Sequence, residues 1–430
     1  KEFSQQGAKT VLIEKENDLL EGASKGNSAI LHTGFDAPPG SLELDCVKRG
    51  YEEYIKIKND FNLPFLKTSA MVVAWSQEQL DNLEAIHLKG LGNGIDNLSI
   101  IDQKEVLKKE PNLSYNAKGA IVVEDESIID PWNSPLAYLK LGIHAGGKTA
   151  FSHEVTDGSF NGEFWQLKTS QNTINAKVVI NAAGLYGDVV DRIKGSNDFE
   201  IIPRKGQFII FDKTAYNLIN SIILPVPTKI TKGVVITKTV FGNILVGPTA
   251  EDQPSRNDSV VVQDTLKDLQ QKAFTMLPSL KDHKIVATFA GLRPASDKPH
   301  YRVDINKEKN WITVGGIRST GLTSALGLAK YVFSLQEKTF KPTKSNFDNI
   351  TLANITQLQQ RDFQKKGYEK IVCHCEHVTD REIKEACQGE VGAGTMGGLK
   401  RRTRATMGRC QGFNCLADVA QICEDQKVQS

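Results

Sequence analysis

Four of the seven cysteines stand in two close pairs near the end of the chain. One residue separates Cys373 from Cys375, and four residues separate Cys410 from Cys415. Pairs with such short spacings can converge on one metal centre, and thiolates are the ligands that iron–sulfur clusters and zinc select. The sequence therefore predicts a four-thiolate metal centre, with structural zinc or unpaired buried cysteines as the alternatives to an iron–sulfur cluster.

A basic run lies beside the second pair and contains Lys400, Arg401, Arg402, Arg404 and Arg409. A cluster held by four thiolates carries net negative charge, and neighbouring cations raise its reduction potential and lower the cost of burying it. After the first pair, the segment 378–387 predicts a helix that is capped by Thr379, with Glu382 three residues later. We interpret Cys387 and Cys423 as small helix residues and Cys46 as a core residue.

The pattern CHCEHVTDREI, followed by RRTRATMGRCQGFNC, resembles the bacterioferritin-associated-ferredoxin-like [2Fe–2S] module. This module occurs as a C-terminal domain on some FAD-dependent dehydrogenases, including the large subunit of anaerobic glycerol-3-phosphate dehydrogenase. The resemblance implies a [2Fe–2S] cluster whose ligands are Cys373, Cys375, Cys410 and Cys415.

The composition is that of an ordinary globular protein with several domains. The chain has 430 residues, of which 40% are hydrophobic and 24% charged, and its formal net charge is +2. This charge predicts no nucleic-acid or membrane partner. No apolar run approaches the roughly 18 residues of a transmembrane helix. With no visible signal peptide and a cluster-type thiol pattern, we expect a reducing, cytoplasmic compartment.

A short apolar run at Thr10–Glu14 ends in an acid. In a dinucleotide-binding βαβ unit, such an acid binds the ribose hydroxyls, and the glycine fingerprint lies about 20 residues earlier. That position falls before residue 1. We therefore expect the chain to begin inside a Rossmann unit, without the first strand and its phosphate loop, and to retain FAD poorly by itself. A solvated strand end is the alternative interpretation of Glu14.

Two further glycine motifs match nucleotide-binding patterns in the wrong context. GAGTMG, at Gly392–Gly397, follows a predicted helix and lies inside the cysteine module. GIHAGGKT, at Gly142–Thr149, lies between a predicted helix and a predicted strand, which reverses the strand–loop–helix order of a P-loop. Neither motif predicts a nucleotide site, and the second predicts a helix–turn–strand corner.

The stretch NSAILHTGFDAPPGSL begins at Asn27 and resembles the D-amino-acid-oxidase-like FAD superfamily, in the branch of glycerol-3-phosphate dehydrogenases and L-2-hydroxyglutarate oxidases. Ala29 stands where this family usually has Gly. The resemblance implies that His32 faces the reactive edge of the flavin and accepts the proton of a substrate hydroxyl. It also implies that Arg293, in IVATFAGLRPAS, pairs with the anionic group of the substrate. Taken alone, these residues would equally suit a core histidine and a surface arginine.

The same resemblance implies FAD contacts along the chain. The segment 311–335 predicts a strand, a Gly–Gly turn and a helix, whose first backbone N–H groups can stabilise negative charge on a reduced flavin. The implied cofactor contacts are Glu14, Ser24, Asn27, Ser28, Val155, Gly184, Gly315, Thr320, Gly321, Leu322 and Thr323.

We therefore predict an α/β protein in three parts. Residues 1–337 form a Rossmann-type FAD-binding domain, interleaved with a substrate domain built on a mixed or antiparallel sheet. Residues 338–370 form a linker with some helix near 357–365, and residues 371–430 form a small helical [2Fe–2S] domain. Residues 63–75 predict one strand, and residues 76–92 predict a helix capped by Ser76.

The predicted activity is oxidation of a hydroxyl-bearing carbon in a small anionic substrate, first of all sn-glycerol 3-phosphate to dihydroxyacetone phosphate. Electrons would pass through the cluster to a partner subunit, a quinone or another carrier, which could hold the protein at the inner face of the membrane. A guanidinium suits a carboxylate as well as a phosphate, so L-2-hydroxyglutarate and amino-acid or opine substrates are alternatives. A non-catalytic electron-transfer subunit is the alternative of another class.

Overall fold

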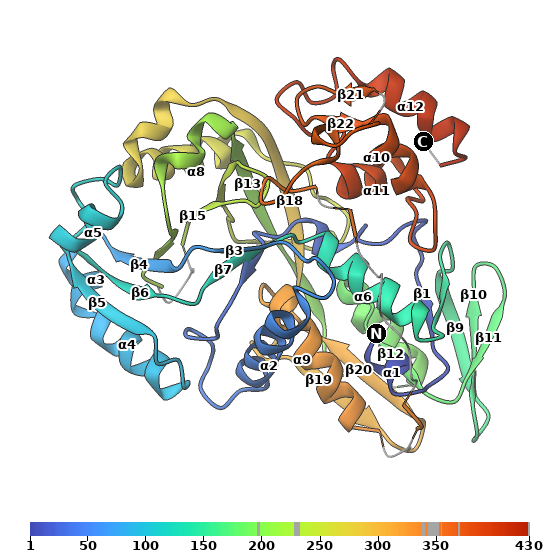
Figure 1. Cartoon of the computed structure of the whole chain (residues 1–430). Helices are drawn as coiled ribbons and strands as arrows, with labels where there is room; N and C mark the ends of the chain where they lie inside the picture. Colours follow the sequence, from blue (N-terminus) through green and yellow to red (C-terminus); the bar gives the residue numbers. More distant parts are fainter. Residues whose placement is uncertain are drawn as a thin grey trace.

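The computed structural model describes residues 1–195, 198–227, 233–336, 340–342, 352–353, 355–368 and 370–428. A long twisted sheet fills one side of the molecule, several short sheets lie beside it, and a helical module formed by the C-terminal residues packs at one end (Figure 1). The predicted α/β class is confirmed. Much of the predicted linker, and its boundary at residue 338, lies outside the described residues.

The largest sheet has nine strands, in the order β17-β13-β16-β15-β14-β4-β6-β5 with β18 paired to β13. The β14–β4 pair is parallel and the other pairs are antiparallel, so the sheet is mixed, as predicted. The strands are β4 (Ala70–Ala74), β5 (Leu98–Asp102), β6 (Gly119–Val123), β13 (Ile201–Phe211), β14 (Ile222–Pro225), β15 (Val235–Lys238), β16 (Ile244–Gly247), β17 (Glu251–Asp252) and β18 (Ile285–Ser296).

Five short sheets account for the other strands. Strands β1 (Val11–Ile13) and β8 (Lys148–Ala150) pair in parallel, and β12 (Val179–Asn181), β20 (Trp311–Gly315) and β19 (Arg302–Asn306) form a second sheet. The remaining sheets contain β2 (Ile30–Leu31), β7 (Ser127–Ile129) and β3 (Phe65–Lys67); β9 (Val155–Phe160), β10 (Trp165–Thr169) and β11 (Thr173–Ala176); and β21 (Ile371–Cys373) with β22 (Val378–Thr379).

The α-helices cover these sheets and build the module. They are α1 (Glu2–Gln5), α2 (Leu42–Ile57), α3 (Gln77–Asp81), α4 (Leu83–Gly92), α5 (Gln103–Lys109), α6 (Asn133–His144), α7 (Gly187–Asp191), α8 (Gln263–Met276), α9 (Gly321–Ser334), α10 (Asp380–Cys387), α11 (Met396–Thr403) and α12 (Leu416–Asp425). Short 3₁₀ turns include η1 (Ala23–Lys25), η2 (Gly184–Tyr186), η4 (Lys213–Leu218), η5 (Pro278–Asp282) and η6 (Asp362–Gln364).

Helix α2 lies directly against α9, and two glycines allow this close contact. A Cβ at Gly50 would collide with the backbone of Thr323, and one at Gly327 would collide with the backbone of Cys46. Helix α2 begins at Ser41, whose Oγ accepts a hydrogen bond from the backbone N–H of Leu44 at 3.1 Å. The pair thereby fixes the start of α9 beside the loop that leads into α2.

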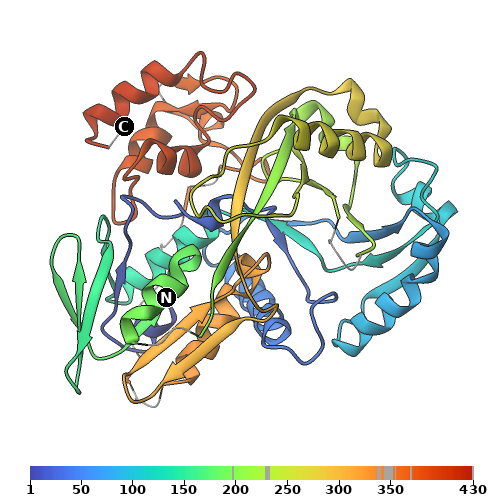
Figure 2. The same cartoon turned by 180° about the vertical axis from the view of Figure 1, so that it is seen from behind.

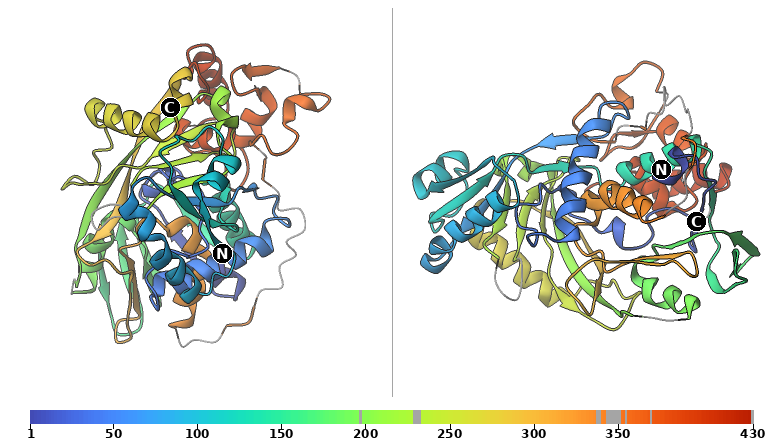
Figure 3. Two further views of the ribbon diagram at one scale, coloured as in Figure 1. Left: turned by 90° about the vertical axis from the view of Figure 1, so that its left-hand side faces the viewer. Right: turned by 90° about the horizontal axis from the view of Figure 1, so that it is seen from below.

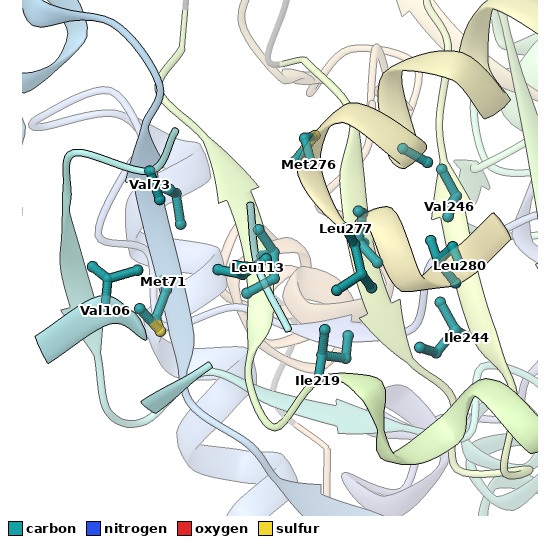
Figure 4. Close-up of a cluster of buried hydrophobic side chains, with 14 of the residues drawn as sticks. Met71, Val73, Val106, Leu113, Ile219, Ile244, Val246, Met276, Leu277 and Leu280 are labelled. Carbon is teal, nitrogen blue, oxygen red and sulfur yellow. The ribbon is translucent and has the colours of Figure 1, made fainter. Parts of the chain in front are cut away.

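The main core lies between the large sheet and α8. Figure 4 shows Met276 of α8, Leu277, which joins α8 to η5, and Leu280 of η5 beside Ile244 and Val246 of β16, with Met71 of β4 farther along. Residues of β4 alternate between this cluster and a second one on the opposite face, and all five are buried. A strand that is buried on both faces has a continuous apolar sequence, and β4, with the sequence AMVVA, is such a strand.

Two element predictions were wrong in their boundaries. Residues 63–75 form two strands in different sheets, because Ser69 takes a left-handed backbone with φ of 60° and breaks the run. The helix predicted at 76–92 is divided into α3 and α4 at Asn82, although Ser76 caps its start as predicted. The corner predicted for the P-loop-like motif is confirmed, since α6 turns directly into β8.

The C-terminal module packs on the rest of the chain beside the N-terminal segment, coloured dark blue in Figure 2, and Figure 3 shows the same arrangement from two more directions. Gly394 lies against the backbone of Asn17, and Gly398 lies against the carboxylate of Asp18, where a Cβ would collide in each case. The backbone N–H of Gly394 donates to Asp18 at 2.9 Å. The glycines of the GAGTMG motif and its neighbour therefore serve close packing between the module and residues 17–18.

Adjacent glycines in α11 provide a test of this packing. A Cβ at Gly398 would overlap the Asp18 carboxylate, whereas the nearest atom to a Cβ at Gly397 lies 3.4 Å away. We expect Gly398→Ala to lower the free energy of unfolding by about 1–3 kcal/mol through overpacking. Gly397→Ala should be neutral or raise it by up to about 1 kcal/mol through helix propensity. Chemical denaturation of both variants measures their free energies of unfolding, and equal values would contradict the packing argument.

Candidate active site and cluster site

His32 follows β2 and is held by the first turn of α9. Its backbone N–H donates to Thr323 Oγ1 at 3.0 Å, and the same hydroxyl donates to the Ile30 carbonyl at 3.2 Å. The imidazole Nδ1 lies 3.0 Å from Glu126 Oε2, and 22% of the His32 side chain remains exposed. The structure thus brings two predicted residues, His32 and Thr323, into direct contact.

The loop before His32 contains three predicted cofactor contacts and one strained residue. Ser24 is exposed in η1, and Asn27 and Ser28 are half-buried. Ala29 has a left-handed φ of 65°, held by its N–H bond to Asn27 Oδ1 at 2.7 Å. This conformation explains why glycine is usual at position 29, because a Cβ makes left-handed backbone costly by roughly 1–2 kcal/mol.

Close backbone contact joins the same loop to the strand of Arg293. An ideal Cβ at Gly26 would lie 2.8 Å from the Cα of Gly291, and one at Gly291 would lie 2.7 Å from the Gly26 carbonyl oxygen. Arg293 comes two residues later on β18. The loop that leads to His32 and the strand that carries Arg293 are therefore packed together.

Arg293 is a largely buried cation that is held by carbonyl groups. Its guanidinium donates to the backbone oxygens of Arg204, Lys205 and Thr249, the last at 2.6 Å. Burial, with the nearby charge of Arg204, lowers the pKa of Arg293 to about 10. Within the described part of the chain, Arg293 forms no ion pair, whereas Arg204 is bound to Asp252. A fixed cation of this kind suits an anionic ligand.

The strand, turn and helix start predicted in segment 311–335 are present in the structure. Strand β20 ends at Gly315, whose Cα faces the Phe199 ring, and α9 begins at Gly321. Thr320 does not cap the helix with its side chain; its hydroxyl instead donates to Glu43 at 2.7 Å. The first amides of α9, including that of Leu322, thus have no side-chain cap from Thr320 and can bind an acceptor.

The other predicted FAD contacts lie around the small parallel strands. Glu14 follows β1, and its backbone pairs with Ala150 at 2.9 Å and with His153, two residues before Val155. Burial raises the pKa of Glu14. Gly184 begins η2 after β12 with a φ of 57°, and open space lies where its Cβ would be. Glu14 and Gly184 follow the ends of β1 and β12, which is where α/β folds bind cofactors, and Val155 begins β9.

Glu126 was missed in the sequence. It is fully buried, and besides His32 it accepts two hydrogen bonds from Thr33, from the backbone N–H at 2.6 Å and from the hydroxyl at 2.9 Å. It lies in the acidic stretch VVEDES, in which nothing distinguishes it from Glu124 and Asp125. Only the strand pairing that joins residues 94 apart shows which of the three acids meets His32.

The four predicted cluster ligands lie as two neighbouring pairs. Cys375 lies near Cys410, and Cys373 lies near Cys415, because each side chain affects the pKa of its neighbour. Backbone N–H groups, led by that of Asn414, lower the pKa of Cys410 and favour its thiolate. Among the described residues, no group of three or more His, Cys, Asp or Glu is arranged to hold a single metal ion. The donor set suits a centre that two thiol pairs share.

The arginine run makes contacts that were not predicted. Arg402 donates to Asp18 through both terminal nitrogens, at 2.8 and 3.0 Å, and Arg401 binds Glu21. Arg409 pairs with Asp212 at 3.0 Å. These three arginines reach carboxylates outside the module, so they dock it as well as adding positive charge near the thiols.

Arg404 and Glu376 also lie at the contact between the module and the rest of the chain, which we call the seam. Arg404 Nε donates to Glu376 at 2.8 Å, and its guanidinium covers the Phe241 ring at 4.3 Å from the centroid. Lys213 reaches the same carboxylate at 3.1 Å. Burial would raise the pKa of Glu376, but Arg404 and then Lys213 outweigh burial and lower it. Glu376 adjoins Cys375, so a predicted thiol ligand is tied directly to the docking contacts.

Comparisons with known protein families agree with this arrangement. The family described as FAD dependent oxidoreductase matches residues 2–335, and the BFD-like [2Fe-2S] binding domain matches residues 371–425. The chain belongs to the FAD dependent oxidoreductase family. It is an FAD-dependent enzyme with a [2Fe–2S] binding domain, and this domain match favours the cluster over the zinc alternative.

Several relatives of this oxidoreductase have named activities. A glycerol 3-phosphate dehydrogenase from Caloramator mitchellensis is 34% identical over 98% of this chain and 90% of its own length. An L-2-hydroxyglutarate dehydrogenase from Indibacter alkaliphilus is 26% identical over 77% of this chain and 93% of its own. The structure of FAD-bound, dithionite-reduced L-α-glycerophosphate oxidase from Mycoplasma pneumoniae superposes with a TM-score of 0.77 at 25% identity, over 82% of this chain and 95% of that one.

In this structure no helix among the described residues is long and apolar enough to cross a membrane.

The two modules should be separable by one substitution. We expect Cys410→Ser to remove the visible absorption of the [2Fe–2S] cluster, because an alcohol replaces the thiolate whose pKa is lowered by backbone N–H groups. Reduction of the flavin by substrate should persist. Cys387→Ser, outside the four ligands, should retain the cluster. Loss of flavin reduction in the Cys410 variant would show that the oxidoreductase region depends on the cluster.

The contribution of Glu376 to stability at the seam should decrease in acid. The folded-state pKa of Glu376 lies below its ordinary value, so its contribution is complete above about pH 5 and is lost as the pH falls through the folded-state pKa. We expect Glu376→Gln to lower the free energy of unfolding by about 2–3 kcal/mol at pH 7, with a smaller difference at pH 4. Chemical denaturation at both values tests this, with exposed Glu163→Gln as the control. A difference independent of pH would contradict the ionised pair.

Proposed function

We propose that this enzyme oxidises sn-glycerol 3-phosphate to dihydroxyacetone phosphate and passes the two electrons through its [2Fe–2S] domain to an acceptor. The observation that carries the proposal is the largely buried guanidinium of Arg293, which has three backbone carbonyl partners and no described carboxylate partner. The relative named glycerol 3-phosphate dehydrogenase supports this substrate, because its similarity extends over both the oxidoreductase region and the cysteine module.

Arg293 would bind the phosphate of the substrate. A planar guanidinium can donate two parallel hydrogen bonds to a phosphate, and carbonyl groups already hold it in a fixed orientation. Arg318, whose pKa is lowered by burial, lies in the same part of the protein and is bound to the carbonyls of Ser296 and Lys298. Two cations for which no ion pair is recorded in the described part of the chain favour a doubly charged phosphate over a single carboxylate.

His32 would take the proton of the substrate hydroxyl. Its backbone is fixed by Thr323, and its ring is oriented by the hydrogen bond at Nδ1. FAD, when bound, supplies a two-electron acceptor for the hydride that leaves the hydroxyl-bearing carbon. The products balance as dihydroxyacetone phosphate, two electrons and two protons, one of which His32 receives from the oxygen.

The residues present fit FAD, and we assign its contacts to the predicted set. The uncapped start of α9, with Gly321, Leu322 and Thr323, would face the flavin, because helix N-terminal amides stabilise negative charge. Glu14, Val155 and Gly184 would bind the adenosine half, at the strand ends where they lie. The remaining contacts would come from Ser24, Asn27, Ser28, Gly315 and Thr320.

Cys373, Cys375, Cys410 and Cys415 would be the ligands of the cluster, which transfers electrons singly. Its acceptor would be a protein partner or a quinone in a cytoplasmic enzyme, associated with the membrane only through that partner. L-2-hydroxyglutarate is the second candidate substrate, because dehydrogenases of this compound are among the relatives and its carboxylates could also bind Arg293.

Anaerobic spectroscopy of the full-length protein tests the substrate. Glycerol 3-phosphate should bleach the flavin absorption within seconds, and L-2-hydroxyglutarate or an amino-acid panel should not. Bleaching by L-2-hydroxyglutarate alone would replace the first candidate with the second.

Arg293→Lys provides the matched variant for this experiment. A lysine keeps the charge but loses the second parallel hydrogen bond. KM for glycerol 3-phosphate should therefore rise by about ten- to a hundredfold, which corresponds to roughly 1.4–2.8 kcal/mol. An unchanged KM would contradict the assignment of Arg293 to the substrate anion.

A further inference from the structure

We propose that Glu126 is the positioning residue for His32, because it fixes which ring nitrogen carries the proton and stabilises the protonated ring. The inference rests on the proposed function, in which His32 accepts the proton of the substrate hydroxyl. It adds to that function a group which the sequence did not single out and which need not touch the substrate.

The pairing register of β2 and β7 places Glu126 beside His32. Strands β2 and β7 are antiparallel, with Ile30 opposite Ile128 and Leu31 opposite Ser127. Continuing this register by one residue places His32 opposite Glu126, just beyond the end of each strand. The contact is therefore built into the sheet, and the measured distance of 3.0 Å between Nδ1 and Oε2 agrees with it.

The surroundings of Glu126 are satisfied best by an ionised carboxylate. Oε1 accepts from the backbone N–H and from the hydroxyl of Thr33, and Oε2 faces Nδ1 of His32. The side chain of Glu126 is fully buried. Because a buried charge needs hydrogen bonds and a partner, an Nδ1–H donor completes the site.

This arrangement has two chemical consequences. In the neutral ring the proton lies on Nδ1, so the lone pair lies on Nε2 and can receive the hydroxyl proton. When the substrate O–H bond breaks, that proton joins Nε2, and the imidazolium that forms is attracted to the carboxylate. FAD, when bound, would supply the acceptor for the hydride that leaves the hydroxyl-bearing carbon, so the step would leave a carbonyl and a protonated His32.

Other charged or titratable groups nearby are already engaged. Tyr51 approaches from α2, and its hydroxyl donates to the Asp125 carbonyl at 2.9 Å. Burial, with the charges of Asp125 and Glu126, raises the pKa of Tyr51 to about 12, so it stays neutral. The Asp125 carboxylate pairs with Lys67 at 3.3 Å. In the described part of the chain, the ion pair recorded for Glu126 is the one with His32.

Substitution by the isosteric amide tests the role kinetically. Glu126→Gln keeps an oxygen for Thr33 but presents an NH₂ donor to Nδ1, which forces the ring proton to Nε2. We expect kcat for substrate-dependent flavin reduction to fall on the order of 10²-fold or more, with KM changed less than about threefold. Glu126→Asp should recover part of kcat, because it restores the carboxylate on a shorter side chain.

Glu110→Gln is the matched control for loss of a buried carboxylate. Glu110 is also fully buried, but it binds backbone N–H groups of Asn220 and Ser221. Its amide variant should lose stability and retain kcat. If Glu126→Gln loses stability to the same extent and keeps kcat within about threefold, Glu126 is a structural residue and the proposal is wrong.

A spectroscopic readout separates this proposal from the assignment of the substrate. In protein labelled with ¹⁵N-histidine, the His32 signals, identified by their loss in His32→Gln, should show the Nδ1-protonated ring. In Glu126→Gln they should show the Nε2-protonated ring. An unchanged tautomer would overturn the role of Glu126 whatever substrate reduces the flavin. A wild type that glycerol 3-phosphate does not reduce would instead overturn the proposed function, while the tautomer comparison still decides the role of Glu126.

Discussion

The attachment of the cysteine module depends on one buried carboxylate, that of Asp18. It accepts two hydrogen bonds from Arg402 and one from the backbone N–H of Gly394, and its side chain is 1% exposed. Removing a single partner from such a pair leaves an uncompensated buried charge, which costs about 3–5 kcal/mol. Asp18 lies four residues after Glu14, so the segment that leads away from the expected ribose contact also anchors the cluster domain.

In the proposed function, this anchoring would serve electron transfer. The flavin would gain two electrons as a hydride and pass them to the cluster one at a time, so the two centres would have to stay at a fixed separation during both transfers. Arg402, Arg404 and Arg409 each pair with a carboxylate, and Arg402 does so through two nitrogens. Planar guanidinium groups fix orientation better than ammonium groups do. The seam is therefore polar and specific, in contrast to the apolar core beneath α8.

Sequence-based predictions were correct where the residues that decide a feature lie close together in the chain. The cysteine spacing, the Thr379 cap and the Gly–Gly turn before α9 each depend on residues a few positions apart, and the structure has them as predicted. They failed where the decisive partner is far away in the sequence. The contacts of the arginine run with Asp18, Glu21 and Asp212 were missed, because these acids are far from the run in the sequence. Ser69 divides the predicted strand through a left-handed backbone angle that its residue type does not indicate. Glu126 became visible only through the β2–β7 register.

The contrast between buried cations with and without an ion-paired carboxylate supports the proposed role of Arg293. Lys194 is buried against Asp191, Arg256 against Asp188, and Arg404 against Glu376, as expected when desolvated charges must be compensated. Arg293 departs from this pattern, since carbonyl groups hold it, no ion pair is recorded for it among the described residues, and its pKa falls to about 10. A lowered pKa means that burial disfavours the cation, and an arriving anion relieves that penalty by supplying the missing charge. In the proposed function, binding energy at Arg293 would therefore come from compensating a charge that has no ion-paired carboxylate among the described residues, and it would be available only to a substrate that brings at least one negative group.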